Sequence, residues 1–230
     1  EGLVCISEKE NKFSMIEINS ETDFVAKNKE FINFAEEVSK LALVKFGKIE
    51  NILDTEMKNK KSVKDNLLDL TSKIGEKITF RRSAFIGENE SLNFSYTHTP
   101  TKKNIGKLGV LISLVTTKSK AEISELGKHL AMQVASSAPL AIDENDLDPN
   151  ILKKEKEIIT AELKNSGKDN KIVEKIASGK LNKFIAENTL LNQEWIMEPK
   201  KKVKDIIKEV AGTDKIKIKQ FVRFKTGEGL

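Results

Sequence analysis

Residues 13–28 read FSMIEINSETDFVAKN, and the spacing of the apolar residues changes at this point in the chain. In the first half Ile16 and Ile18 alternate with Glu17, which is the period of two that predicts a half-buried strand with Glu17 on its polar side. After this stretch, apolar residues recur at steps of three and four residues, at Phe31, Phe34, Val38 and Leu41. This spacing predicts an amphipathic helix. The sequence therefore predicts that a strand leads through a short polar segment into a helix.

The same two periods predict further elements on both sides of this stretch. We expect strands over 4–6, 78–86, 108–115 and 216–224, and helices over 63–74, 123–134 and 203–210. Gly75 is a plausible end for the 63–74 helix. A polar turn over 7–12 should join the first two strands, and 87–107 is interpreted as a polar connector.

The order strand, strand, helix, helix, strand is expected twice. An ungapped shift of 140 positions places Val203, Lys204 and Asp205 on the identical run that begins at Val63. This match indicates a duplicated unit, although chance matches between Lys- and Ile-rich segments are the alternative. Between the expected helices over 123–134 and 203–210, two polar helices with narrow apolar stripes predict an antiparallel helical hairpin, with its turn at Asn165–Gly167.

Composition narrows the possible classes of protein. Among 230 residues, 40 Lys and Arg are interspersed with 35 Asp and Glu, so the net charge is only +5. A nucleic-acid-binding module is one alternative, supported by a pI of about 9.0 and the cluster at Lys200–Lys202 and Lys204. It is disfavoured because only 6% of residues are aromatic and no stacking motif is present.

The chain has one cysteine, Cys5, which excludes an internal disulfide and a thiolate metal cluster and fits a cytoplasmic location. No apolar run approaches the roughly 20 residues of a membrane span, and no signal peptide is visible. Because the sequence begins with Glu1 and not Met, we expect a fragment or a processed product.

Known reaction centres are absent from the sequence. It has no G-x-x-x-x-G-K-[ST] phosphate loop, no G-x-G-x-x-G and no G-x-S-x-G. Its two histidines, His98 and His129, lie 31 residues apart, which does not suit a zinc site. We therefore expect no enzymatic activity, no metal, no cofactor and no direct nucleotide binding.

Four motifs occur in the order in which one protein family carries them. They are TDFVAK at Thr22–Lys27, GKLGVL at Gly106–Leu111, LAMQVASSAP at Leu130–Pro139, and MEP at Met197–Pro199 followed by FVRFKTGE at Phe221–Glu228. With these motifs the chain resembles the bacterial elongation factor Ts family. Nothing in it matches the three-helix module with which members of that family usually begin.

The resemblance implies an α+β fold of two related subdomains, each with a small antiparallel sheet packed by helices, plus a protruding helical hairpin that forms a coiled coil. On this basis we expect an N-terminal core subdomain over 1–95 and a C-terminal core subdomain over 96–148 and 191–230. The hairpin, 149–190, would be inserted into the second subdomain.

The resemblance also implies a function. Members of the family are guanine-nucleotide exchange factors that bind elongation factor Tu with GDP, disturb its magnesium and phosphate site, and promote GDP release so that GTP can bind. The residues that match the partner-binding tip are Thr22, Asp23, Phe24 and Val25, with Phe24 as a wedge near the partner's magnesium. Further partner contacts carried over from the family are Leu108, Gly109, His129, Met132 and Gln133.

Each of these residues also has a structural interpretation. Ser20 and Asp23 have the spacing of a capping box, and Phe24 could pack into the chain's own core. His129 and Gln133, one helical turn apart, could be a solvent-facing or capping pair, and Gln133 cannot become cationic. Leu108 and Gly109 could be a strand entry with a bulge. A scaffold that dimerises through its sheets or hairpin is a further alternative function, and a homodimer is possible.

Overall fold

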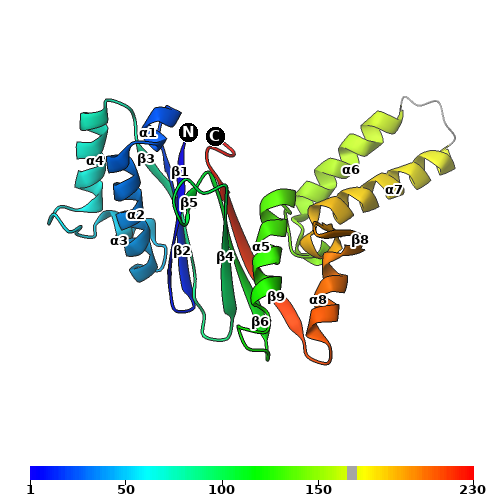
Figure 1. The fold of residues 1–230 in the computed structure, drawn as a ribbon. Coiled ribbons are helices and arrows are strands. Elements are labelled where there is room, and N and C mark those ends of the chain that lie inside the picture. The colour runs from blue at the N-terminus through cyan, green and yellow to red at the C-terminus, as the bar shows by residue number, and fades with distance from the viewer. Residues whose placement is uncertain (165–169) are drawn as a thin grey trace. The chain divides into compact units, whose positions relative to one another are not determined.

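The computed structural model describes residues 1–164 and 170–230 and shows a mixture of helices and antiparallel sheets (Figure 1), which confirms the predicted α+β class. The elements of the first half, in chain order, are β1 (Gly2–Lys9), β2 (Lys12–Asn19), α1 (Asp23–Ala26), α2 (Lys29–Val44), α3 (Ile49–Leu53), α4 (Val63–Ile74), β3 (Thr79–Ile86), β4 (Leu92–His98), β5 (Ile105–Gly106) and β6 (Leu108–Thr116). The second half contains α5 (Ser124–Ser137), η1 (Glu144–Asp146), α6 (Pro149–Lys164), α7 (Asn170–Asn188), η2 (Leu190–Asn192), β7 (Glu194–Trp195), β8 (Glu198–Lys202), α8 (Val203–Ala211) and β9 (Ile216–Lys225). The predicted helices and most of the predicted strands are confirmed.

The first sheet has the strand order β3-β2-β1-β5. The turn between β1 and β2 is shorter than the predicted 7–12, because pairing continues from Ser7↔Ser14 to Lys9↔Lys12. Polar Ser7 and Ser14 remain in the strands because each has a hydrogen-bond partner on α2: Ser7 Oγ lies 2.7 Å from Ser39 Oγ, and Ser14 Oγ donates to the backbone carbonyl of Ser39 at 2.7 Å.

A helical layer covers one face of this sheet. The side chains of α2 that the spacing predicted to be apolar are buried, including Phe31 at 0% exposure, and they pack with Ile16 and Ile18 of β2. Asn28 caps α2 by accepting hydrogen bonds from the N–H groups of Glu30 and Phe31. Gly75 ends α4, as predicted, and the structure shows it in the left-handed conformation.

The second sheet has the strand order β4-β6-β9. The prediction that 87–107 is a polar connector was wrong, because β4 and β5 lie within it. The polar side chains of β4 conceal the strand in the sequence. Asn93 is fully buried, and it is satisfied by Asn11 of the β1–β2 turn and by Ser113 of β6.

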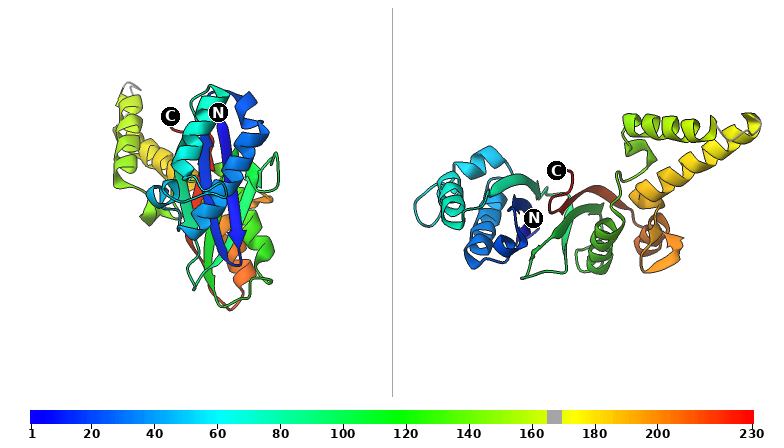
Figure 2. Two further views of the ribbon diagram at one scale, coloured as in Figure 1. Left: turned by 90° about the vertical axis from the view of Figure 1, so that its left-hand side faces the viewer. Right: turned by 90° about the horizontal axis from the view of Figure 1, so that it is seen from above.

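The two sheets face each other across an apolar core, which we call the inter-sheet core. It is formed by Val4, Ile6, Phe13, Met15, Ile86, Leu111 and Phe224. Helix α5 lies against the outer face of the second sheet (Figure 2). Gly127 permits this approach, because a Cβ there would lie 2.4 Å from the ring of Phe94. The first compact unit, residues 1–135 and 213–230, is thus layered as helices, sheet, sheet and helix.

The two sheets share one topology. Three neighbouring strands lie in the order β3-β2-β1 in the first sheet and β9-β6-β4 in the second. Along the chain, helices separate the second of these strands from the third in both sheets, β2 from β3 and β6 from β9. The aligned runs at Val63 and Val203 begin α4 and α8 respectively. In this comparison the missed strand β4 corresponds to β1, since each is the first of its three strands along the chain.

Residues 136–212 form the second compact unit. Within it α6 and α7 contact each other, with Ile159 and Leu163 buried and Lys180 Nζ lying 2.5 Å from Glu162 Oε2. The predicted turn at Asn165–Gly167 lies outside the described residues. The subdomain boundaries at residues 95, 148 and 190 stay a prediction.

Candidate functional site

A short helix, α1, presents Phe24 at the end of strand β2. The Phe24 side chain is 78% exposed, whereas Val25 and Ala26 beside it are 6% and 3% exposed and belong to the core under α2. The interpretation of Phe24 as a core residue is therefore wrong. The single turn of helix points one large ring into solvent while its neighbours anchor the turn.

Thr22 is fixed from a distant part of the chain. Its N–H and its hydroxyl donate to the two carboxylate oxygens of Glu76, at 3.0 and 2.7 Å. Glu76 directly follows the Gly75 cap of α4, and 54 residues separate it from Thr22. No local pattern in the sequence indicated this pair, which attaches the start of α1 to the end of α4.

Asp23 does not form the predicted capping box with Ser20. The Ser20 hydroxyl donates to the carbonyl of Thr22, and Asp23 instead accepts from Lys27 at 2.6 Å, one turn later. This hydrogen bond from Lys27 holds the pKa of Asp23 below its ordinary value. The Lys27 ammonium also lies 6.0 Å from the centre of the Phe24 ring. The exposed ring thus stands beside a neutralised ion pair.

Leu108 and Gly109 begin strand β6. Leu108 is partly exposed, whereas Gly109 is buried, and a Cβ on Gly109 would lie 2.8 Å from Val4 Cγ1 and 2.9 Å from Met15 Sδ. The predicted bulge is not at this position, because the register of β6 and β9 shifts between Ser113 and Leu114. Gly109 is therefore required for the close packing of the inter-sheet core, and its contact with a partner stays a prediction.

The candidate residues of α5 divide by exposure. His129 and Met132 are partly exposed, and His129 Nδ1 lies 4.0 Å from Glu125 Oε1. Gln133 is completely buried. The interpretation of His129 and Gln133 as a solvent-facing pair is thus wrong for Gln133, which belongs to the core.

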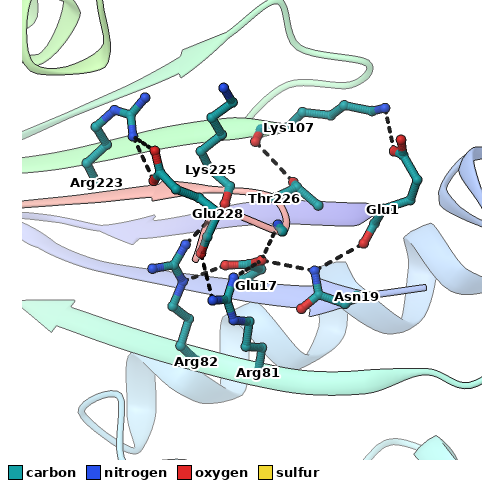
Figure 3. A network of polar contacts seen from close by, with 11 residues as sticks. Glu1, Glu17, Asn19, Arg81, Arg82, Lys107, Arg223, Lys225, Thr226 and Glu228 are labelled. Carbon is teal, nitrogen blue, oxygen red and sulfur yellow. Dashed lines mark hydrogen bonds and ion pairs between the residues drawn. The ribbon is translucent and has the colours of Figure 1, made fainter. Parts of the chain in front are cut away.

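Hydrogen bonds link the tip Thr22–Val25 to the start of β6. The carbonyl of Glu1 accepts from the Ser20 N–H at 3.2 Å, and the Glu1 carboxylate pairs with Lys107 Nζ at 2.6 Å (Figure 3). The carbonyl of Lys107 in turn accepts from the N–H and hydroxyl of Thr226, at 2.8 and 3.0 Å. Three of the motifs found in the sequence therefore meet at one end of the first compact unit.

The centre of this end is Glu17, which was expected on the polar side of its strand but is 0% exposed. Its carboxylate accepts from Arg81 at 3.0 Å, Asn19 at 2.9 Å and the Gly227 N–H at 2.8 Å, and also from Arg82 Nε (Figure 3). Burial by itself would raise the pKa of Glu17, but these donors outweigh it and hold the pKa below the ordinary 4.5.

Comparison with known proteins identifies the family. The model of the family described as "Elongation factor TS" matches residues 21–228. The "Elongation factor Ts" of Rhodospirillum centenum is 34% identical over 233 residues, which cover 100% of this chain and 76% of the relative. The proteins of that name from Caulobacter vibrioides and Rickettsia prowazekii are each 35% identical, with 76% and 75% of their lengths covered. The chain belongs to the elongation factor Ts family.

Membership in the elongation factor Ts family confirms the resemblance and makes the chain a translation elongation factor. Among the residues that the structure describes, no group of three or more His, Cys, Asp or Glu side chains is arranged to hold a metal ion. No helix within the described ranges is both long and apolar enough to cross a membrane.

Three residues that the sequence analysis did not single out support the candidate site of this elongation factor Ts family chain. Glu76 accepts a hydrogen bond from Thr22, and Asn28 caps the helix after the tip. Glu17 accepts a hydrogen bond from the Gly227 N–H near the C-terminus. The Phe221–Glu228 motif could have pointed to Glu17, because Gly227 of this motif donates its N–H to the buried Glu17 carboxylate.

Proposed function

We propose that this chain is a guanine-nucleotide exchange factor. It binds elongation factor Tu with GDP, disturbs the magnesium and phosphate site of that GTPase, and promotes GDP release so that GTP can bind. Membership in the elongation factor Ts family supports this function. The observation that carries it is the Phe24 ring, 78% exposed on a helix turn whose other residues are anchored.

An exposed aromatic ring on a fixed mount suits insertion into a partner. Burying the ring would contribute about 1.5–3 kcal/mol of binding free energy. Because Val25 is in the core and Thr22 is held by Glu76, little further ordering of α1 is required on binding. The bonds to Glu76 thus keep the ring available as a wedge.

The wedge acts by favouring one state of the partner. Magnesium requires nearly ideal octahedral geometry, so small displacements of its ligands weaken its binding. A ring that fits only the displaced arrangement lowers the affinity for GDP, because the two ligands favour different states of the partner. Exchange on this account requires no reacting group from the chain, which is not an enzyme, uses no cofactor and binds no nucleotide itself.

The other candidate residues act in different ways. Leu108, His129 and Met132 have exposed surface and are the direct contacts with elongation factor Tu. Gly109 and Gln133 are buried and support this surface from within. Asp23 forms an ion pair with Lys27, and this pair lies beside the Phe24 ring. The site of action is the cytoplasm, where translation elongation occurs.

The finer architecture belongs to the same proposal. The common strand order of the two sheets supports two related core subdomains. The contact between α6 and α7 supports a hairpin that forms a short coiled coil. Its narrow buried seam suits a segment that contributes little to the stability of the core.

Release of labelled GDP from elongation factor Tu, followed with and without this chain by stopped flow, tests the proposal. We expect faster release with the chain, and dissociation of the complex by free GDP, because coupling between two ligands is reciprocal. A chain that binds elongation factor Tu without accelerating release would be a scaffold, and the proposed function would be wrong.

A further inference from the structure

A buried carboxylate lies where the inter-sheet core ends. On β2 the side chains of Phe13, Met15 and Glu17 follow each other at a spacing of two residues, and the first two belong to the inter-sheet core. Glu17 continues this row and is also completely buried. A charge in such a position requires partners that compensate the loss of water.

A β-bulge brings two arginines to this carboxylate. Glu17 pairs with Arg82, while the next residue, Ile18, pairs with Phe80, so Arg81 is the extra residue of β3. A bulge of this type bends its strand and redirects its side chains. Here Arg81 and Arg82 both reach Glu17, although residues adjacent in a regular strand point to opposite faces.

The same arginines hold the end of the chain. Arg81 Nη2 donates to the carbonyl of Glu228 at 2.7 Å, and Arg82 Nη2 donates to the carbonyl of Lys225 at 3.1 Å. Arg82 also stacks on the Phe224 ring, at 4.2 Å from its centre. Together with the Gly227 N–H on Glu17, these bonds attach the end of β9, in the second sheet, to β2 and β3, in the first.

Two connections lead from this attachment to the residues of the proposed exchange surface. Thr226 donates to the carbonyl of Lys107, directly before Leu108. Arg223 pairs with Glu228 at 2.7 Å and donates to the carbonyl of Ala135 on α5 at 3.3 Å. The tip belongs to the first sheet, whereas Leu108 and α5 belong to the second sheet and its helix, so contacts around Glu17 connect the two groups.

Stability alone is a weak reason for this arrangement. A buried ion pair often contributes no more to stability than an apolar group of the same size, because removing charges from water is costly. What the charges add is geometry, since a carboxylate with four donors fixes the direction of each of them. The network therefore defines one relative placement of the sheets at the end that carries Phe24.

We propose that Glu17 is a positioning residue that sets where the tip Thr22–Val25 stands relative to Leu108 and α5, so that all three can engage the partner at once. The inference rests on the proposed function, and it deepens it. The placement of the tip is also a property of the free chain, so it can be measured without elongation factor Tu.

The variant for the test is Glu17→Gln, which keeps the shape of the side chain and removes its charge. The matched control is Asn11→Ala. Asn11 joins the same two sheets at the other end of the inter-sheet core, through its Oδ1 and backbone carbonyl to Asn93 and its amide to Ser91. If Glu17→Gln does not fold, Arg81→Gln replaces it, because Arg82 still compensates the carboxylate in that variant.

The first measurement is the distance between spin labels on Glu21→Cys and Lys128→Cys, both exposed positions, by pulsed electron paramagnetic resonance. Cys5 is 1% exposed, and burial raises its pKa to about 12, so it should remain unlabelled. We expect a wider distance distribution in Glu17→Gln than in wild type and no widening in Asn11→Ala. A distribution of wild-type width in Glu17→Gln would overturn the inference.

The second measurement is GDP release from elongation factor Tu over a range of chain concentrations, on samples shown to be folded. Because misplacement by about 1 Å can reduce a rate by about 100-fold, we expect at least about a tenfold lower saturating rate for Glu17→Gln. Asn11→Ala should retain the wild-type saturating rate. A normal rate in Glu17→Gln, or equal losses in both variants, would overturn the positioning role. Absence of exchange by wild type would instead refute the proposed function.

Discussion

The two ends of the inter-sheet core are closed by different chemistry. At the end near Phe24, the charged end, the Glu17 carboxylate accepts hydrogen bonds from Arg81, Arg82, the Asn19 side-chain amide and the Gly227 N–H. At the other end, the amide end, Asn11, Asn93 and Ser113 are joined by amide and hydroxyl hydrogen bonds, and Lys120 Nζ lies 3.4 Å from Asn11 Oδ1. Along β2 the ends lie about 20 Å apart, at about 3.3 Å for each residue.

At both ends the strand pairing contains a register shift, as at a β-bulge. In the first sheet the register shifts between Glu17 and Ile18, and in the second it shifts between Ser113 and Leu114. Glu17 and Ser113 are both fully buried on an inner strand of their sheet. Of these two positions, the one at the end with the exposed ring carries a carboxylate paired with two arginines, and the other carries a hydroxyl. This difference associates the charges with the surface and not with sheet packing in general.

The largest effect on folding is expected from Glu17→Ala. It leaves two guanidinium groups without their carboxylate, and breaking a buried ion pair costs about 3–5 kcal/mol of unfolding free energy. Arg81 and Arg82 remain 19% and 30% exposed, so we expect about 3 kcal/mol, measured by urea denaturation. A loss no larger than that of Asn11→Ala would contradict this difference between the two ends.

The charged end should also respond to acid. The pKa of Glu17 is lower in the folded chain than its ordinary 4.5, so its contribution is complete above about pH 4.5 and disappears as the pH falls through the folded pKa. The difference in unfolding free energy between wild type and Glu17→Gln should therefore shrink below that pH. Other carboxylates titrate in the same range, and subtracting the two variants removes their effect. A difference that does not change with pH would contradict this assignment.

A smaller effect is expected from Asn11→Ala at the amide end. It leaves the Asn93 N–H without its acceptor in a buried place, at a cost of about 1–3 kcal/mol. Because the lost partners are the Asn93 N–H, the Ser91 carbonyl and the Lys120 ammonium, and none is a carboxylate, the loss relative to wild type should be the same at pH 4 and pH 7. Thermal or urea unfolding measures it. A loss that varies with pH would mean that titratable groups also support this end.

The sequence predicted the parts of the fold in which the apolar spacing is regular. Helix α2, helix α4 and strand β9 were predicted from their periods, and the end of α4 at Gly75 was predicted from the residue type. Strand β4 was missed because Asn93 is a polar residue in a core position, satisfied by Asn11, 82 residues earlier in the chain. Local spacing contains no information about such a distant partner.

The candidate site was predicted in its residues but not in its support. The motif at Thr22–Val25 indicated the tip, but only the structure shows that Phe24 is exposed while Val25 is buried. Glu17 was assigned to the polar side of its strand because it alternates with Ile16 and Ile18. Its donors lie 64, 65 and 210 residues away in Arg81, Arg82 and Gly227, which no short pattern reveals.

The most direct test of the central claim, that the charged end presents a wedge, is the saturating rate of GDP release from elongation factor Tu with Phe24→Ala. Leu68→Ala is the matched control, because Leu68 is also exposed, at 59%, but lies on α4. A core Phe→Ala change would cost about 3–5 kcal/mol, whereas Phe24→Ala should melt as wild type does. We expect its saturating rate to fall at least about tenfold, which corresponds to about 1.4 kcal/mol, with no change for Leu68→Ala. A folded Phe24→Ala chain that releases GDP at the wild-type rate would contradict the account.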